Sequence, residues 1–332
     1  MPANRVNGNG NRARSGAQTL SLLAAPLNVA VIRALRHGTR RQAELLSFAG
    51  SPAPSTLRAQ LKRLVAAGVI RTQRRNRFPG LLEYELSEAG RDLIAVIEVV
   101  ERWLALAPES PLTLGDNEAK ATIKALADGW SATIVRAIAA GPRTLTELDR
   151  IISSLNYPAL ERRLSAMRLA RLLAVHAGNG RGTPYTVTKW LRRGIGPLLS
   201  ASRWEQRHPH EATVPVGRLD AEAALLLAVP LLRLPPAFNG SCRMAVEIPG
   251  PEGKRLAGAF ITVADGAVAS CVTHLGGDAD AWALGPTGAW LAAIIDRDID
   301  GLELGGDHEL ASSLLRHLNR AIFDSRESAK QA

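Results

Sequence analysis

The sequence is short of cysteine and of aromatic residues. Only Cys242 and Cys271 occur among 332 residues, which excludes a disulfide framework or a cysteine zinc site and favours a reducing compartment. Aromatic residues make up 4% of the chain and apolar residues 46%. The cores must therefore be built from aliphatic side chains, and helices are favoured.

Long apolar runs and catalytic motifs are also missing. The longest apolar stretch, residues 223–234, contains Pro230 and Arg233 and is shorter than the ~20 residues of a membrane span. The first 18 residues have no apolar run of the signal-peptide kind, so we expect a cytoplasmic protein without a membrane partner. There is no Gly-x-x-x-x-Gly-Lys-Ser/Thr loop, Gly-x-Ser-x-Gly elbow or His-Glu-x-x-His pair, and we expect neither an enzyme nor a cofactor.

What the chain does have is an uneven distribution of charge. Its net charge of +10 divides into +9 for residues 1–103, +6 for residues 104–213 and −5 for residues 214–332. The basic residues 1–213 and the acidic residues 214–332 predict a polyanionic partner for the N-terminal, basic part alone. The length predicts two or three domains.

An internal repeat organises the first two thirds of the chain. Residues 31–40 match residues 134–143 at an offset of 103, and after a two-residue shortening Trp103 falls on Trp204. The pattern predicts two similar domains in tandem.

Each copy shows the pattern of three helices and a hairpin. In the first copy we expect helices over residues 27–35, 41–48 and from Ser55, which is placed to cap the third helix, then strands over 69–74 and 82–86 and a long helix from Ser87. In the second copy we expect helices over 130–139, 144–153 and 158–169, with a hairpin tip that carries one arginine instead of three. This order is typical of winged helix-turn-helix domains.

The first copy also resembles a known family. It is similar to the HxlR family of regulators, which is related to the MarR type, over about residues 20–105, and residues 125–205 are similar more faintly. The segments that carry the likeness are 32–35, Gly38, Arg40, Arg41, 55–57, 61–70 and above all Glu83 to Gly90. The resemblance implies a DNA-binding regulator with its third helix in the major groove and its wing on the backbone. The family's N-terminal cysteine is absent here, so thiol sensing is not implied.

The candidate DNA contacts follow from this arrangement. Arg58 is the best candidate for reading a base edge, whereas the arginines at 63, 74, 75 and 77 are better suited to phosphate. Glu161 stands in the second copy where Arg58 stands in the first, which predicts weaker contact there. The full set of candidate residues is Ser55, Thr56, Arg58, Lys62, Arg63, Arg74, Arg75, Arg77, Arg162, Arg163 and Arg181.

Two assembly states are open. A covalent tandem can act as a monomeric pseudo-dimer with Trp103 and Trp204 near its interface, or the chain can form a conventional homodimer. Ordinary core packing accounts for the two tryptophans equally well.

The last third of the chain predicts an α+β domain. We expect a helix over residues 220–232, strands over 242–248, 256–263 and 267–274, and helices over 287–295 and 309–323 that flank a short strand. From Trp282 onward the sequence resembles a sterol-carrier-protein-like domain, through residues 288–294, 301–307 and 310–318. That resemblance implies an apolar ligand between sheet and helices, and the candidate lining residues are Phe260, Trp282, Trp290 and Leu291. A solid core is the simpler role for each of them.

A weak calcium-loop pattern overlaps the same region. Asp296, Asp298, Asp300 and Asp307 have the spacing of a calcium loop with Gly301 at its sixth position, but the twelfth residue is not glutamate. We expect no bound metal.

The fold class predicted is thus mainly α with small β wings, followed by an α+β domain. The expected boundaries are a basic arm (1–18), winged helix-turn-helix units (19–107 and 125–207) joined by a linker (108–124), a second linker (208–218), the sterol-carrier-like domain (219–325) and a tail (326–332). The expected function is a DNA-binding regulator that responds to an apolar small molecule. The alternatives are a protein-interaction scaffold with degenerate winged helices and a lipid or acyl carrier.

Overall fold

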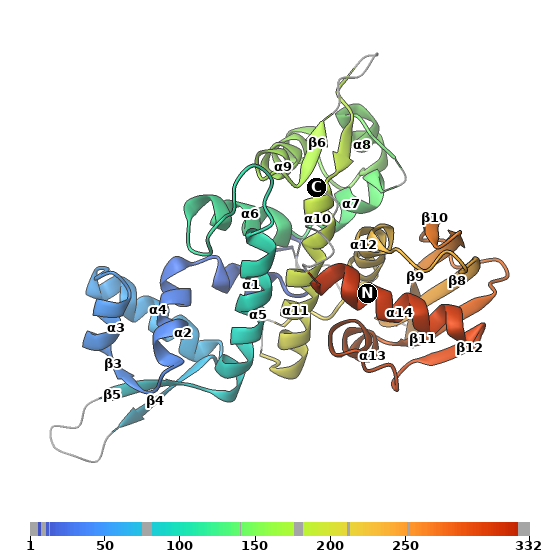
Figure 1. Ribbon diagram of the computed structural model, residues 1–332. Coiled ribbons are helices and arrows are strands. Elements are labelled where there is room, and N and C mark those ends of the chain that lie inside the picture. The colour runs from blue at the N-terminus through green and yellow to red at the C-terminus, as the bar shows by residue number, and fades with distance from the viewer. Residues whose placement is uncertain are drawn as a thin grey trace.

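The computed structural model describes residues 6–7, 11–12, 14–74, 82–139, 141–175, 182–210, 213–250 and 253–324. Its first elements, β1 (Val6–Asn7) and β2 (Asn11–Arg12), pair with each other only. Three larger parts follow along the chain (Figure 1). Within the described residues no single helix has the length and apolarity to cross a membrane, although the bent pair Ala17–Leu23 and Pro26–Leu35, which turns by 82°, passes that test jointly.

The first part combines five helices with a three-stranded sheet of order β3-β5-β4. Most leucines of its helices are buried, so the helical spacing of apolar residues produces one shared core. Its elements are α1 (Ala17–Leu23), α2 (Pro26–Leu35), β3 (Arg40–Arg41), α3 (Gln42–Phe48), α4 (Pro54–Ala66), β4 (Ile70–Arg74), β5 (Leu82–Leu86) and α5 (Glu88–Leu104).

The start of α4 differs from the sequence prediction. Ser55 does not cap the helix, because the N-cap is Ala53, two residues earlier, and Pro54 is the first residue of α4. Proline suits that position since its missing N–H would have no helical partner there. Ser55 is instead an exposed residue of the first turn.

The second part repeats the order of helices and hairpin seen in the first. Arg143 bridges to Tyr185 just as Arg40 pairs with Tyr84, and Thr144 forms a capping box with Glu147 at the start of α8. Its elements are α6 (Asn117–Ala127), α7 (Ser131–Ile138), α8 (Leu145–Ile151), α9 (Tyr157–Leu169), β6 (Leu173–Val175), β7 (Tyr185–Val187), α10 (Lys189–Arg193) and α11 (Ile195–Arg207).

Two segments expected to lie outside the folded units are part of them. The stretch 108–124 contains the start of α6, whose Ala119 and Ile123 are buried. Arg14 and Ser15, expected in a free arm, are also buried. Burial of Arg14 is possible because Asp220, far along the chain, supplies the opposite charge.

The first two parts meet through a reciprocal pair of tryptophan contacts. The indole N–H of Trp103 donates to the carbonyl oxygen of Trp190 at 3.1 Å, and that of Trp204 donates to the carbonyl oxygen of Ala89 at 2.8 Å. Trp103 and Trp204 are 101 positions apart, as are Ala89 and Trp190. The same contact is therefore made twice with the roles of the two parts exchanged, as in a two-fold interface.

The third part is a five-stranded sheet with helices on one face. Its order is β10-β9-β8-β11-β12, in which β11 runs parallel to β8 and the other neighbours are antiparallel. The sequence prediction missed β11. The elements are α12 (Arg218–Ala228), η1 (Val229–Leu231), β8 (Gly240–Gly250), β9 (Gly253–Ala264), β10 (Ala267–Val272), β11 (Ala281–Pro286), α13 (Thr287–Leu291), the π-helical turn η2 (Ala292–Asp296), β12 (Glu303–Gly306) and α14 (His308–Phe323).

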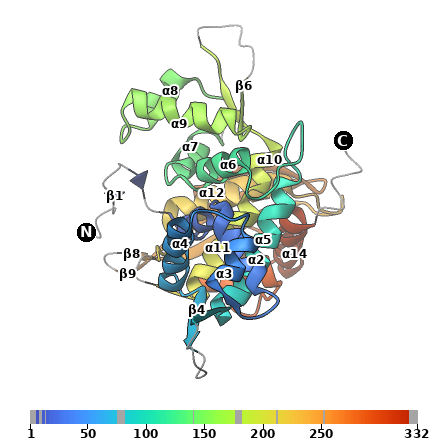
Figure 2. The same ribbon diagram turned by 90° about the vertical axis from the view of Figure 1, so that its left-hand side faces the viewer.

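The three parts are arranged around the central pair α5 and α11. The hairpins β4–β5 and β6–β7 lie at opposite ends of the molecule in both views (Figures 1 and 2). The third part packs through α12, α13 and α14 against α7, α10 and α11. It therefore sits beside the second part and away from α4.

Candidate nucleic-acid interface

Helix α4 separates an apolar face from a cationic one. Leu57, Leu61 and Leu64 are at most 1% exposed and hold the helix against the core. Because these leucines recur at helical spacing, the residues between them face outward. The expected contact residues on α4 are all exposed, namely Ser55, Thr56, Arg58, Lys62 and Arg63.

The hairpin of the first part lies beside this helix, since β4 packs against α4. Its strand β4 carries Arg71, which is 61% exposed and forms an ion pair with Glu85, a carboxylate that also accepts from Gln73. Arg71 was not among the predicted contact residues. It lies opposite Glu85 in the pairing of β4 with β5. Arg74 ends β4; its side chain, together with Arg75 and Arg77, lies outside the described residues.

Hairpin and helix are tied together by the turn after β5. The Ser87 hydroxyl accepts from the backbone N–H of Gly90 at 3.0 Å and donates to the carbonyl oxygen of Val69 at 2.9 Å. A β-carbon on Gly90 would lie 2.1 Å from that same oxygen, so only glycine fits here. The string Glu83 to Gly90 therefore fixes where the wing leaves the helical body.

The second part presents a different surface. On α9, Arg162 and Glu161 are exposed, whereas Arg163 is 12% exposed, lies 3.5 Å from Asp128 and covers the ring of Trp130 at 5.8 Å. Arg163 thus faces the core and does not share a surface with Arg162. Arg181 lies outside the described residues.

Apolar side chains are exposed on this second surface. Ile151 is 54% exposed and Leu169 is 74% exposed, at the two ends of the α8 and α9 pair. The pair α3 and α4 also exposes apolar side chains, Phe48 at 61% and Val65 at 40%, so the face of α8 and α9 differs from it mainly in its lower positive charge.

The four residues expected to line a ligand pocket fall on two faces of the third part. Trp290 and Leu291 line a cavity between α11, α12 and α13. Phe260 and Trp282 are both in register with Arg243 and so lie on the other face of the sheet. The prediction does not hold for these two, because strand alternation sends them away from the helices.

Two of the four candidate calcium residues are engaged elsewhere. Asp296 pairs with Arg203 at 3.0 Å and with Arg207 at 3.3 Å, and Asp307 caps α14 by accepting from the N–H of Leu310. Across the described ranges no three His, Cys, Asp or Glu side chains gather at metal-binding distance.

The two cysteines are poorly suited to redox sensing. Burial raises the pKa of Cys242 and of Cys271 to about 12. A thiol reacts as its thiolate, and at neutral pH both sulfurs are protonated.

Comparison with known proteins assigns the first part. Residues 23–110 match the family model described as HxlR-like helix-turn-helix. The uncharacterised HTH-type transcriptional regulator YtcD of Bacillus subtilis (strain 168) is 33% identical over 85 residues, which are 26% of this chain and 68% of YtcD. The regulator Rv3095 of Mycobacterium tuberculosis (strain H37Rv) is 35% identical over 89 residues, 27% of this chain and 56% of its own.

Two solved structures are also similar to part of the chain. The reduced form of the transcriptional regulator YodB from B. subtilis is 26% identical and aligns with a TM-score of 0.27 over 28% of this chain and 90% of its own. A crystal structure of the regulator ytcD is 32% identical, with a TM-score of 0.25 over 26% and 88% of the two chains. Through residues 23–110 the chain belongs to the HxlR-like helix-turn-helix family.

Proposed function

We propose that the chain is a DNA-binding transcription regulator whose residues 19–107 and 125–207 form tandem winged helix-turn-helix units. The observation that carries this proposal is the exposed cationic face of α4 beside the β4–β5 hairpin, in the segment that belongs to the HxlR-like family. The acidic third part packs against α7, α10 and α11, so α4 is open to a duplex.

The tandem acts as an internal pseudo-dimer. Regulators with one winged helix commonly pair to read two half-sites, and the exchanged contacts of Trp103 and Trp204 support an equivalent pairing inside one chain. Because α9 carries Glu161 where α4 carries Arg58, the two units read DNA unequally. The preferred operator has one strongly specified half-site.

Salt dependence of DNA binding tests the wing. A duplex obtained by selection from random DNA is titrated with the native chain and with a triple variant, Arg74→Ala, Arg75→Ala and Arg77→Ala, at several salt concentrations. The slope of log K against log salt is negative, and each lost phosphate contact reduces its magnitude by about 0.9. For the triple variant we therefore expect the slope to be shallower by up to ~2.7. An unchanged slope removes the wing from the interface, and no enrichment in the selection overturns DNA reading altogether.

We propose further that the third part holds a small-molecule effector, as the sterol-carrier resemblance implies. The cavity that Trp290 and Leu291 line on the helical side of the sheet supports this proposal. Ligand response is thus part of the proposed function.

A second candidate function concerns the second part alone. The exposure of Ile151 and Leu169 favours a protein partner on α8 and α9, as in a scaffold with a degenerate winged helix. Replacing Leu169→Ser and measuring DNA affinity separates the two: an unchanged affinity leaves this face for protein contact, whereas a loss assigns it to DNA.

A further inference from the structure

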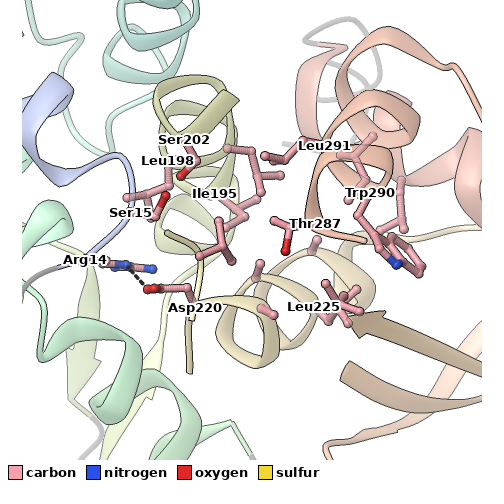
Figure 3. Close-up of a pocket in the computed structure, with 18 residues that line it drawn as sticks. Arg14, Ser15, Ile195, Leu198, Ser202, Asp220, Leu225, Thr287, Trp290 and Leu291 are labelled. Atoms are coloured by element: carbon pink, nitrogen blue, oxygen red, sulfur yellow. Dashed lines mark hydrogen bonds and ion pairs between the residues drawn. The ribbon is translucent and has the colours of Figure 1, made fainter. Parts of the chain in front are cut away.

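A small cavity lies where the N-terminal residues, the second part and the third part meet. It has a volume of about 60 Å³ and is walled by α11, α12, the α13–η2 segment and Arg14 with Ser15. Figure 3 shows Arg14, Ser15 and Asp220 at one end and Trp290 with Leu291 at the other. The cavity is therefore shared among parts of the chain that are far apart in sequence.

One end of the cavity is polar but electrically balanced. Arg14 is 5% exposed; its Nε donates to Asp220 Oδ1 at 3.0 Å and its Nη1 to the carbonyl oxygen of Leu126 at 3.1 Å. Charge in this end is already neutralised by the pair. A ligand with a net charge would leave an uncompensated ion here, which is costly away from water.

Ser15 provides an unused hydrogen-bonding group at the same end. The residue is 4% exposed, and its Oγ has no hydrogen-bond partner among the described residues. Buried polar atoms in folded proteins are nearly always paired, and an unpaired one costs roughly the strength of a hydrogen bond. The hydroxyl faces the cavity, so a molecule inside it can supply the partner.

The other end is mainly apolar, and the hydroxyl of Thr287 there already donates to the carbonyl oxygen of Glu247 at 3.3 Å. The indole N–H of Trp290 is satisfied by the carbonyl oxygen of Ala245 at 2.9 Å, and Leu291, Ile294, Leu225 and Val246 also line this end. Transfer of an apolar group from water into such a place is favourable. Water needs two to four polar partners, which this end does not provide.

We propose that this cavity binds a small neutral amphiphile, with an apolar chain against Trp290 and a hydroxyl or carbonyl head on Ser15. Its size limits the ligand to a short chain, because drug-sized ligands occupy ~300 Å³ or more. The site spans the boundary between the second and third parts, whereas the resemblance to sterol carriers implies a site within the third part alone.

The location also gives the ligand a route to the DNA-binding units, a consequence that rests on the proposed function. Ser15 precedes α1, whose first turn is held by Glu205 of α11 through hydrogen bonds from Gly16 N at 2.8 Å and Thr19 N at 3.1 Å. Helix α11 lies in the junction with α5. An occupant of the cavity touches α11 and the start of α1 together, and any change it makes in DNA affinity must be matched by an equal effect of DNA on its own affinity.

Calorimetry on the full chain without DNA tests binding. Hexan-1-ol is the probe, compared with hexanoate and hexylammonium, which have the same chain and a charged head. We expect saturable binding of the alcohol with a Kd of about 1 mM and at least ten-fold weaker binding of both ions. Failure of hexan-1-ol to bind up to about 10 mM, which leaves only a water for Ser15, overturns the proposal, as does preference for either ion.

Variants locate the site. Ser15→Ala removes the head-group partner at constant shape, and we expect a five- to ten-fold loss of hexan-1-ol affinity, about one hydrogen bond. Ala224→Leu fills the cavity and is expected to abolish binding. The matched controls are Ser47→Ala and Ala121→Leu, both on exposed helix positions. Retained affinity in both cavity variants overturns the proposal, and Ser15→Ala decides it if Ala224→Leu does not fold.

DNA binding is measured separately. The affinity of the selected duplex is compared with and without saturating hexan-1-ol, and Ala224→Leu serves as the control for solvent effects of the alcohol. An affinity change in the native chain that Ala224→Leu lacks supports the regulatory consequence; no change overturns it while the binding site stands. If the native chain without alcohol does not bind the duplex, that result overturns the proposed function and leaves the cavity proposal unaffected.

Discussion

The contact between the first two parts of the chain can be broken one hydrogen bond at a time. Trp103 is 3% exposed and Trp204 is 5% exposed, and each indole N–H satisfies a backbone carbonyl in the other part. Replacement by phenylalanine keeps a ring in place but removes that hydrogen bond, while the Trp190 carbonyl keeps the bond that it accepts from Gly194 N at 3.0 Å. The lost hydrogen bond costs ~0.5–1.5 kcal/mol and the lost ring area about 1 kcal/mol more, so we expect ~1.5–2.5 kcal/mol for each variant.

The two effects are expected to add. Ala89 and Trp103 are 14 residues apart on α5, which is about 21 Å along a helix. Sites more than ~7–10 Å apart are usually independent. The double variant Trp103→Phe with Trp204→Phe is therefore expected to lose ~3–5 kcal/mol.

Native-state hydrogen exchange is the suitable assay, because it reports the opening free energy of α5 and α11 separately from the third part. Trp282→Phe is the control, since Trp282 lies on the outer face of the C-terminal sheet, and it is expected to leave α5 and α11 unchanged. The reasoning fails if Trp204→Phe alters exchange in α5 no more than Trp282→Phe does, or if the two interface variants differ by more than a factor of two in free energy.

Three further predictions concern single side chains. Arg58→Ala is expected to cost ~1–3 kcal/mol of specific DNA affinity and to relax preference at one base pair, while Arg162→Ala changes selectivity little; equal selectivity losses, measured by repeating the selection, would contradict the assignment. Glu205→Ala leaves three buried donors unpaired, namely Gly16 N, Thr19 N and Thr19 Oγ1, and is expected to lower the free energy of unfolding by ~2–4 kcal/mol. The control Glu98→Ala, at an exposed position, is expected to lower it by under ~0.5 kcal/mol. Denaturant titration measures both. Burial raises the pKa of both cysteines from 9.0 to about 12, so the free energy of unfolding is expected to fall as pH rises from 9 towards 12. Native protein at pH 8 is also expected to react with a disulfide reagent far more slowly than unfolded protein. Equally fast reaction would refute the burial argument.

The helices and the cationic face of α4 could be predicted from sequence because they depend on local patterns. Apolar spacing places Leu57, Leu61 and Leu64 inward, and that alone sets Arg58 and Lys62 outward. The turn at Gly90 was likewise visible in the string from Glu83. Where one residue's role depends on a distant one, the prediction failed: Arg163 turns to Asp128, and nothing in the local pattern of α9 distinguishes it from Arg162.

The sequence by itself determined the repeat, the division of charge and the helical faces, since each is encoded by residue type at short, regular spacing. Only the tertiary structure decided that Arg14 pairs with Asp220, that Trp103 and Trp204 exchange equivalent contacts, and that the cavity lies between parts of the chain. These features arise from residues up to 206 positions apart, and periodicity carries no information about which distant surfaces will meet.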